Sequence, residues 1–134
     1  FCCNVEESQK ILNTESRDIK ELLLGIRGLG PKIITITDGK NGAYLMTADS
    51  NMYVMPIYPD IAPPLERTGA GDAFTSTFAA MLALGKTPEE AITYAPINSM
   101  HVVQFVGAQK GLLNMHELEE YLAAAPADYK LSSI

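Results

Sequence analysis

The residues with the clearest chemical potential lie between Glu66 and Phe74, where Gly69 and Gly71 flank the start of an apolar helix. Glycine lets the backbone turn sharply and approach a ligand closely. At a helix start, unpaired N–H groups and the positive end of the helix dipole face the same point, which predicts an anion site. Asp72 would repel a bound phosphate there, unless a hydroxyl between them gives its proton to the carboxylate while attacking phosphorus.

The same stretch has a purely structural interpretation. Asp72 can stabilise the first helical turn and the glycines can serve close packing, and a lone glycine-rich turn does not decide between the two interpretations. Two other glycine-loop motifs are excluded. A dinucleotide fingerprint starting at Gly69 requires glycine where Phe74 stands, and a Walker loop counted from Gly25 requires lysine where Pro31 stands.

The elements that would position these residues alternate between helices and strands. Helices, indicated by apolar residues at helical spacing with caps and stops at their ends, are predicted over 4–12, from a Ser16 cap through 26, over 69–85, from 87 to about 106, and from Asn114 onward. Strands, indicated by β-branched and apolar runs, are predicted over 32–37, 43–48 and 52–58, the last two as a hairpin. This order predicts an α/β layered fold.

The composition of the chain argues against several classes of protein. The 134 residues, 47% hydrophobic and 19% charged, suffice for one modest globular domain, and a net charge of −6 offers no broad positive field for nucleic acid. No apolar run reaches the ~20 residues of a membrane helix, and no signal peptide is expected. Adjacent Cys2 and Cys3 and the distant His101 and His116 match no disulfide or metal-ligand spacing, so reduced thiols and a cytoplasmic location are expected.

The run from Arg67 to Phe74, R-T-G-A-G-D-A-F, resembles the C-terminal signature of the ribokinase-like (PfkB) carbohydrate kinases, whose usual form is D-T-x-G-A-G-D-x-F. In that family the aspartate is the catalytic base, and the preceding backbone amides form an anion hole for the transferred phosphoryl group. The resemblance therefore implies that Asp72 is the base and that the hole is formed by Gly69, Ala70 and Gly71.

Two weaker motifs stand in the family's order. Asn4 and Glu7 resemble its N-x-x-E element, which helps to place magnesium and the nucleotide phosphates, although this pair is also a plain capping box. Thr37, Gly39 and Gly42 resemble its T-x-G-x-x-G loop, which contacts ATP phosphates and ribose. The same three residues also fit an ordinary strand-ending turn.

A further motif follows toward the C-terminus. Gly107 and Ala108 resemble the family's G-A segment near the adenine pocket, and Asn98 and His101 precede them on the predicted helix. The resemblance implies that Gly107 and Asn98 bind the nucleotide. A structural role, in the core or at the surface, is the alternative for Asn98 and His101.

The resemblance implies the C-terminal part of a ribokinase-like three-layer α/β sandwich, with a mostly parallel sheet flanked by helices and a local hairpin. Residues 1–134 would form a single domain, with the family's N-terminal substrate half and lid absent. The start at Phe1, without a methionine, likewise leads us to expect a fragment, a proteolytic product or an incomplete gene. Such a piece alone is expected to be inactive.

The implied activity is ATP-dependent phosphoryl transfer to a hydroxymethyl group of a sugar or related alcohol, with ATP and Mg²⁺ as cofactors. Arg67 either adds positive charge near the phosphates or forms a surface ion pair. Glu66 replaces an aspartate that some members of the family link to monovalent-cation binding, which leaves a potassium requirement open. The expected partners are a nucleotide, a small sugar-like substrate and further copies of the chain, with no nucleic acid or membrane. The alternatives are a non-catalytic nucleotide-binding or interaction fragment, and a nucleoside kinase of the same fold.

Overall fold

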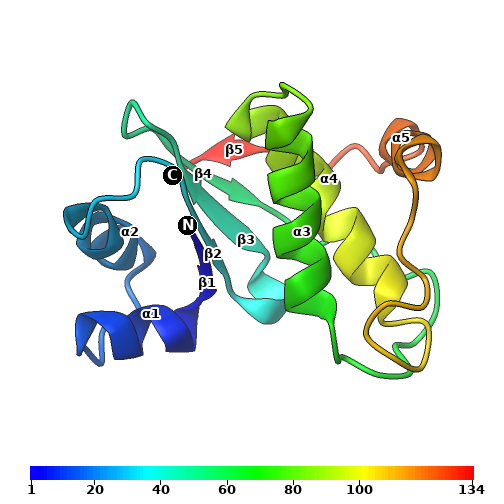
Figure 1. Ribbon diagram of the computed structural model, residues 1–134, viewed down its shortest axis with the longest axis horizontal. Coiled ribbons are helices and arrows are strands. Elements are labelled where there is room, and N and C mark those ends of the chain that lie inside the picture. The colour runs from blue at the N-terminus through cyan, green and yellow to red at the C-terminus, as the bar shows by residue number, and fades with distance from the viewer.

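A computed structural model describes residues 1–134 and contains one five-stranded sheet with helices on both faces (Figure 1). The strands lie in chain order across the sheet: β1 (Cys2–Asn4), β2 (Ile34–Thr37), β3 (Ala43–Met46), β4 (Met52–Met55) and β5 (Ser132–Ser133). One face carries α1 (Val5–Leu12) and α2 (Ile19–Gly28), and the other carries α3 (Ala70–Ala83), α4 (Pro88–Val102) and, beside α4, α5 (Met115–Ala123). The predicted α/β layering is confirmed.

Local sequence signals explain where most helices begin. Helices α1, α4 and α5 each start with a capping box, in which the cap side chain accepts the third N–H of the helix and a glutamate accepts the N–H of the cap. The prediction that Ser16 caps α2 is wrong. Asp18 accepts the Glu21 N–H at 3.0 Å, because it stands three residues before that group, whereas the Ser16 hydroxyl donates to the Glu21 carboxylate.

Helix α4 is shorter than the sequence predicts. It ends at Val102 rather than near 106, because the N–H groups of Gln104 and Phe105 turn back to the carbonyls of His101 and Val102. None of the five helices has the length and apolar character that a membrane span requires.

The direction of the strands differs from the prediction of a mostly parallel sheet. Only β1 and β2 run parallel, and the pairs β2–β3, β3–β4 and β4–β5 are antiparallel. The lengths of the connections explain this result. A parallel pair needs a crossover of a dozen or more residues, which α1 and α2 supply between β1 and β2, whereas β2, β3 and β4 are joined by tight turns.

The sheet separates two hydrophobic cores. The N-terminal core packs α1 and α2 against the sheet and consists of Cys3, Val5, Leu22, Leu23, Ile26, Ile34, Ile36 and Met46. The C-terminal core packs α3, α4 and α5 against the opposite face and draws its fifteen buried side chains from the segment between Ala43 and Tyr129. Successive side chains of a strand point to opposite faces, so β2 serves both layers. Ile34, Thr35 and Ile36 are fully buried, as predicted for this strand.

Arg27 joins the end of α2 to two loops. Its Nη1 atom donates to the carbonyls of Pro31 and Lys32, at 3.3 and 2.8 Å. Its Nη2 atom donates to the carbonyls of Thr47 and Ala48, at 2.7 and 2.9 Å, and contacts the Ser50 hydroxyl at 3.2 Å. All of these acceptors are uncharged, so Arg27 holds the two loops together through hydrogen bonds and not through an ion pair.

Burial makes Cys3 a poor nucleophile, which gives a first prediction. Desolvation, and next the nearby Glu7 carboxylate, raise the pKa of the Cys3 thiol to about 11. At pH 8 only about a thousandth of such a thiol is thiolate, the form that reacts. We expect iodoacetamide to leave Cys3 unmodified in the native protein and to alkylate it after unfolding in urea, as read by peptide mass spectrometry. Equal labelling in both states would contradict this assignment.

Candidate active site

A cavity of about 410 Å³ opens where the two parallel strands end, beside the first turn of α3. It is lined by Asn4, Thr37, Gly39, Lys40, Gly42, Ala43, Ile57, Tyr58, Asp60, Arg67, Ala70, Gly71, Phe74, Pro96, Ser99, Met100 and Val103. Six of the residues predicted from the sequence therefore meet in one wall, although they come from three separate segments. The carboxyl ends of parallel strands are the usual place for ligands in α/β sheets.

The first turn of α3 offers free backbone donors at this cavity. The N-cap residue is Gly69, which has no side chain to satisfy them. The N–H groups of Gly71 and Asp72 have no acceptor in the chain, and that of Ala70 makes only a long bond of 3.4 Å to the Arg67 carbonyl. With the helix dipole, such donors favour an anion. Ser99 of α4 steadies this turn by donating to the Ala70 carbonyl at 2.8 Å.

The two glycines of this turn are required for different reasons. Gly69 has φ of 87°, and a Cβ there would lie 2.7 Å from the Ala108 carbonyl oxygen. It therefore allows the G-A-G-D turn to pack against the Gly107–Ala108 segment. A Cβ at Gly71 would meet no atom within 4 Å, so Gly71 leaves the cavity open without being needed for packing.

Asp72 lies in the first turn of α3, next to the free donors, and is exposed. Its carboxylate makes no hydrogen bond or ion pair within the chain. The side chain does not line the cavity itself but follows Gly71 at its edge. A carboxylate in this position can accept a proton from a group that reaches the anion site from outside the cavity.

The loop between β2 and β3 forms another part of the wall. Thr37, Gly39, Lys40 and Gly42 line the cavity, and the short 3₁₀ turn η1 (Gly39–Asn41) shapes the loop. A Cβ on Gly42, where φ is 92°, would collide with the Met55 carbonyl oxygen, so glycine is required there. The loop is thus held tightly against the end of β4.

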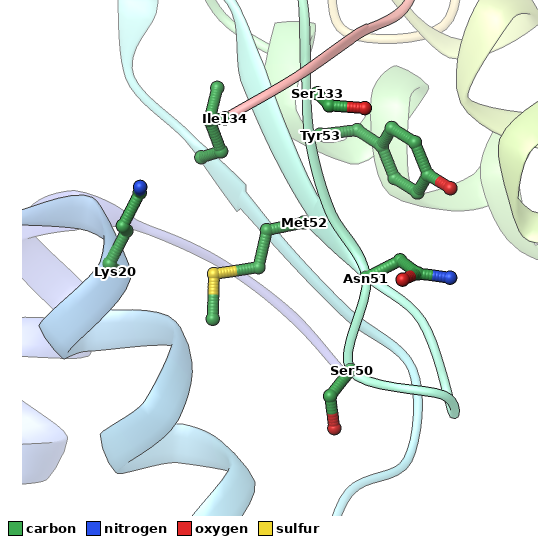
Figure 2. Close-up of a pocket in the computed structure, with 7 residues that line it drawn as sticks. All are labelled: Lys20, Ser50, Asn51, Met52, Tyr53, Ser133 and Ile134. Atoms are coloured by element: carbon green, nitrogen blue, oxygen red, sulfur yellow. The ribbon is translucent and has the colours of Figure 1, made fainter.

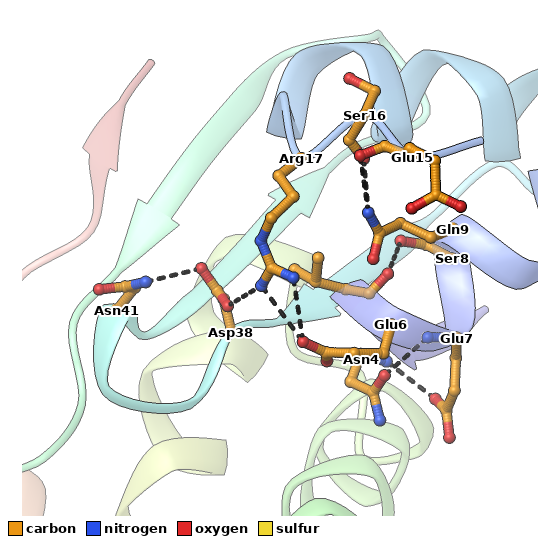
Figure 3. A network of polar contacts seen from close by, with 11 residues as sticks. Asn4, Glu6, Glu7, Ser8, Gln9, Glu15, Ser16, Arg17, Asp38 and Asn41 are labelled. Carbon is orange, nitrogen blue, oxygen red and sulfur yellow. Dashed lines mark hydrogen bonds and ion pairs between the residues drawn. The ribbon is translucent and has the colours of Figure 1, made fainter.

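Asn4 and Glu7 occupy the end of β1 and the first turn of α1 (Figure 3). The Asn4 Oδ1 atom accepts the Glu7 N–H at 2.8 Å, and the Glu7 carboxylate accepts the Asn4 N–H at 2.9 Å. Asn4 also lines the cavity, whereas Glu7 does not. The structural interpretation of the pair as a capping box therefore holds, and the same cap places Asn4 at the cavity.

The predicted residues near the C-terminal end of α4 lie elsewhere. Asn98 is buried, donates to the Thr77 hydroxyl at 2.8 Å and accepts the Leu113 N–H at 2.9 Å, so its amide is used within the protein. His101 contacts the Gly111 carbonyl through Nδ1 at 2.6 Å. Neither side chain lines the cavity.

Gly107 also lies outside the cavity and connects two loops. Its N–H donates to the Glu66 carboxylate at 3.1 Å. The Thr68 hydroxyl, and next this N–H, hold the pKa of Glu66 below its ordinary value. Glu66 therefore joins the segment before α3 to the segment after α4.

Sequence reasoning missed several residues of the cavity. Lys40 and Asp60 stand in loops, Pro96 and Met100 lie on α4, and Val103 is the residue that caps its C-terminal end. The only sequence signal for the α4 residues was their helical spacing, and the same spacing is expected of residues buried in the hydrophobic core. Lys40 and Arg67 line the cavity without an ion-pair partner in the chain, which leaves two positive charges available to an anion.

A second, shallower hollow of about 300 Å³ lies between α2 and the far end of the sheet (Figure 2). It is lined by Lys20, Ser50, Asn51, Met52, Tyr53, Ser133 and Ile134. None of the residues predicted to do chemistry is among them. The candidate site is therefore the larger cavity.

Comparison with known proteins finds the similar sequences among kinases. The model of the pfkB family carbohydrate kinase matches residues 1–115. The ribokinase of Bacillus subtilis is 38% identical over 95 residues, covering 71% of this chain and 31% of that protein. The cytidine kinase of Thermococcus kodakarensis is 31% identical over 88 residues, covering 64% of this chain and 31% of that protein. The chain spans about a third of the length of these relatives.

Among solved structures, the ribokinase of Arabidopsis thaliana in complex with ribose and ATP superposes with a TM-score of 0.80 and 26% identity. The match covers 90% of this chain and 39% of that one. The predicted ribokinase-like fold is confirmed by this similarity.

Proposed function

The chain belongs to the pfkB family of carbohydrate kinases, and on that basis we propose that it supplies the nucleotide site and the catalytic base of a sugar kinase. The reaction would transfer the γ-phosphoryl group of ATP to a hydroxymethyl group of a sugar or related alcohol. The observation that carries the proposal is the convergence of Asn4, the Thr37–Gly42 loop and the first turn of α3 in one cavity.

The phosphates of the nucleotide would lie against the first turn of α3. The free N–H groups of Gly71 and Asp72 would donate to oxygens of the transferring phosphoryl group. Stabilising the charge on these oxygens is the main way in which a protein catalyses phosphoryl transfer. Lys40 and Arg67 would add positive charge from the cavity wall. Asn98 and Gly107 are not assigned nucleotide contacts, because the Asn98 amide and the Gly107 N–H already have partners inside the protein and neither residue lines the cavity.

Asp72 would act as the base. A hydroxyl held between its carboxylate and the bound phosphoryl group would lose its proton to Asp72 while its oxygen attacks phosphorus. No donor of the chain occupies this carboxylate, so it is available to accept that proton. The position of Asp72 at the edge of the cavity suits an acceptor that approaches from outside.

Magnesium would accompany the nucleotide and supply charge neutralisation at the phosphates. The chain has no group of three or more histidine, cysteine, aspartate or glutamate side chains that could hold a metal. The phosphate oxygens would therefore be the main ligands, which is how kinases usually hold Mg²⁺. Asn4 lies at the cavity and could orient such an ion, and Glu7 would act through water because its carboxylate already accepts the Asn4 N–H.

The relatives support this class of reaction and leave two kinds of acceptor to compare. The Arabidopsis ribokinase structure contains ribose and ATP, which supports a sugar acceptor. The Thermococcus relative is a cytidine kinase, which supports a nucleoside acceptor on the same fold. Phosphorylation assays with ribose, fructose and cytidine, run on the full protein that contains these residues, would separate the two.

The site is tested by calorimetric titration of the chain with ATP, with and without Mg²⁺, beside the variant Gly71→Val. We expect magnesium-dependent binding that Gly71→Val abolishes, because the new side chain fills the space where the phosphates would lie. The fold should tolerate the change, since a Cβ at Gly71 meets no neighbour. Ala80→Val, on the exposed side of α3, is the matched control. Unchanged affinity in Gly71→Val would show that the nucleotide does not bind here.

A further inference from the structure

Arg17 connects two segments that are far apart in the chain (Figure 3). It lies between α1 and α2, and both of its terminal nitrogens donate to the Glu6 carboxylate at 3.2 Å. Its Nη2 atom also donates to the Asp38 carboxylate at 3.4 Å. One guanidinium therefore holds two carboxylates, one from the first turn of α1 and one from the loop that follows β2.

Both contacts lie next to the wall of the cavity. Glu6 stands two residues after Asn4, and Asp38 stands between Thr37 and Gly39. Asn4, Thr37 and Gly39 line the cavity. Asp38 is mostly buried, with 19% of its side chain exposed. Its other oxygen accepts from the Asn41 side chain at 2.8 Å, inside the same loop. The ion pair thus ends in the hydrogen bonds that shape the loop.

The charges give Arg17 a second effect. Glu6 and Asp38 both contact the same Nη2 atom, so without the guanidinium two negative charges would face each other beside an anion site. Two carboxylates so close together repel each other, and both also repel an approaching phosphate. No other lysine or arginine pairs with either carboxylate.

We propose that Arg17 is a positioning residue for nucleotide binding, which holds the Asp38–Gly42 loop in its binding shape and neutralises the two carboxylates behind it. The inference rests on the proposed function of the cavity. Arg17 does not line the cavity, so it should affect affinity for ATP through the loop rather than take part in the chemical step.

The variant Arg17→Gln tests this role in two measurements on the same chain. Calorimetric titration with Mg²⁺ and ATP should give a Kd about three- to tenfold higher than that of the wild type, as expected for losing a charge at the rim of a site. Hydrogen–deuterium exchange without nucleotide should be faster at the amides of Asn41 and Gly42, which bond the carbonyls of Asp38 and Gly39.

Two further variants distinguish a charge effect from a general structural effect. Lys20→Gln removes the same charge from α2, away from the loop, and should leave both measurements unchanged. Glu6→Gln in the Arg17→Gln background removes one of the two facing carboxylates and should recover part of the lost affinity. A purely structural support would not be restored by this second change.

The outcomes separate this inference from the proposed function. If the wild type binds ATP and Arg17→Gln binds it equally well, the role of Arg17 is wrong while the nucleotide site stands. If the wild type binds no ATP, the proposed site fails, and the role of Arg17 fails with it. Wild-type exchange rates at Asn41 and Gly42 in Arg17→Gln would overturn the inference even if the site is real.

Discussion

Replacing Asp72 by asparagine is expected to lower the rate of phosphoryl transfer by about 10²–10⁴-fold, the usual contribution of a general base. Affinity for ATP should change by less than about threefold, because asparagine keeps the size of the side chain and leaves the backbone donors of α3 in place. The carboxylate makes no contact within the chain, so the free energy of unfolding should hardly change. A loss of kcat with a nearly constant Kd for ATP would identify Asp72 as the base.

This test requires steady-state kinetics of the full protein that contains these residues, with ATP and the preferred acceptor. Asp49→Asn is the matched control, because Asp49 is an exposed aspartate in the turn between β3 and β4 and lies away from the cavity. Its kcat should equal that of the wild type. If Asp72→Asn kept more than a tenth of the activity, another group would have to accept the proton.

Replacing Arg27 by alanine is expected to lower the free energy of unfolding by about 2–4 kcal/mol. The guanidinium donates to four carbonyls of two loops, and two of these hydrogen bonds are partly buried. Its loss would remove all four of these bonds, which are stronger than neutral ones because the donor is charged. Most single domains are stable by only about 5–15 kcal/mol, so this loss would be a large share of the total.

Urea unfolding of wild type, Arg27→Ala and Arg27→Lys would measure the effect. Lysine keeps the charge but cannot reach both loops with one ammonium group, so it should recover less than half of the loss. Arg17→Gln gives a useful contrast, since exposed ion pairs contribute about 0–1 kcal/mol. If Arg27→Ala were as stable as Arg17→Gln, the hydrogen bonds of Arg27 would contribute no more to the free energy of unfolding than a surface ion pair does.

Structural features that depend on residues close together in the sequence could be predicted well. Helix starts at Asn4, Thr87 and Asn114 follow from a polar cap with a glutamate three residues later, and each forms the expected capping box. The start of an apolar helix at Gly69 could also be located, and its first turn lies at the cavity. The role of this turn as an anion site stays a prediction. Where two caps compete locally, as with Ser16 and Asp18, the sequence leaves the start ambiguous.

Features that depend on distant parts of the chain could not be predicted. Strand β5 has the residues Ser132 and Ser133, which show no strand pattern, and it exists because β4 offers an open edge. The resemblance implies a nucleotide contact for Asn98, and the sequence gives no sign of its buried hydrogen bonds to the Thr77 hydroxyl and the Leu113 N–H. Helical spacing shows which side of α4 is apolar, and it does not tell core from cavity wall.

The division of the interior into two cores gives the protein an order of assembly during synthesis. Every buried side chain of the N-terminal core lies between Cys3 and Met46, so this half can close while the ribosome is still making α3. The C-terminal core has to wait for Tyr129. The cavity takes Asn4 from the early half and Val103 from the late half, so a nascent chain holds only part of the site until Val103 has been made. A nucleotide that binds only when all parts of the cavity wall are present would stabilise the folded structure but not the early half while that half folds.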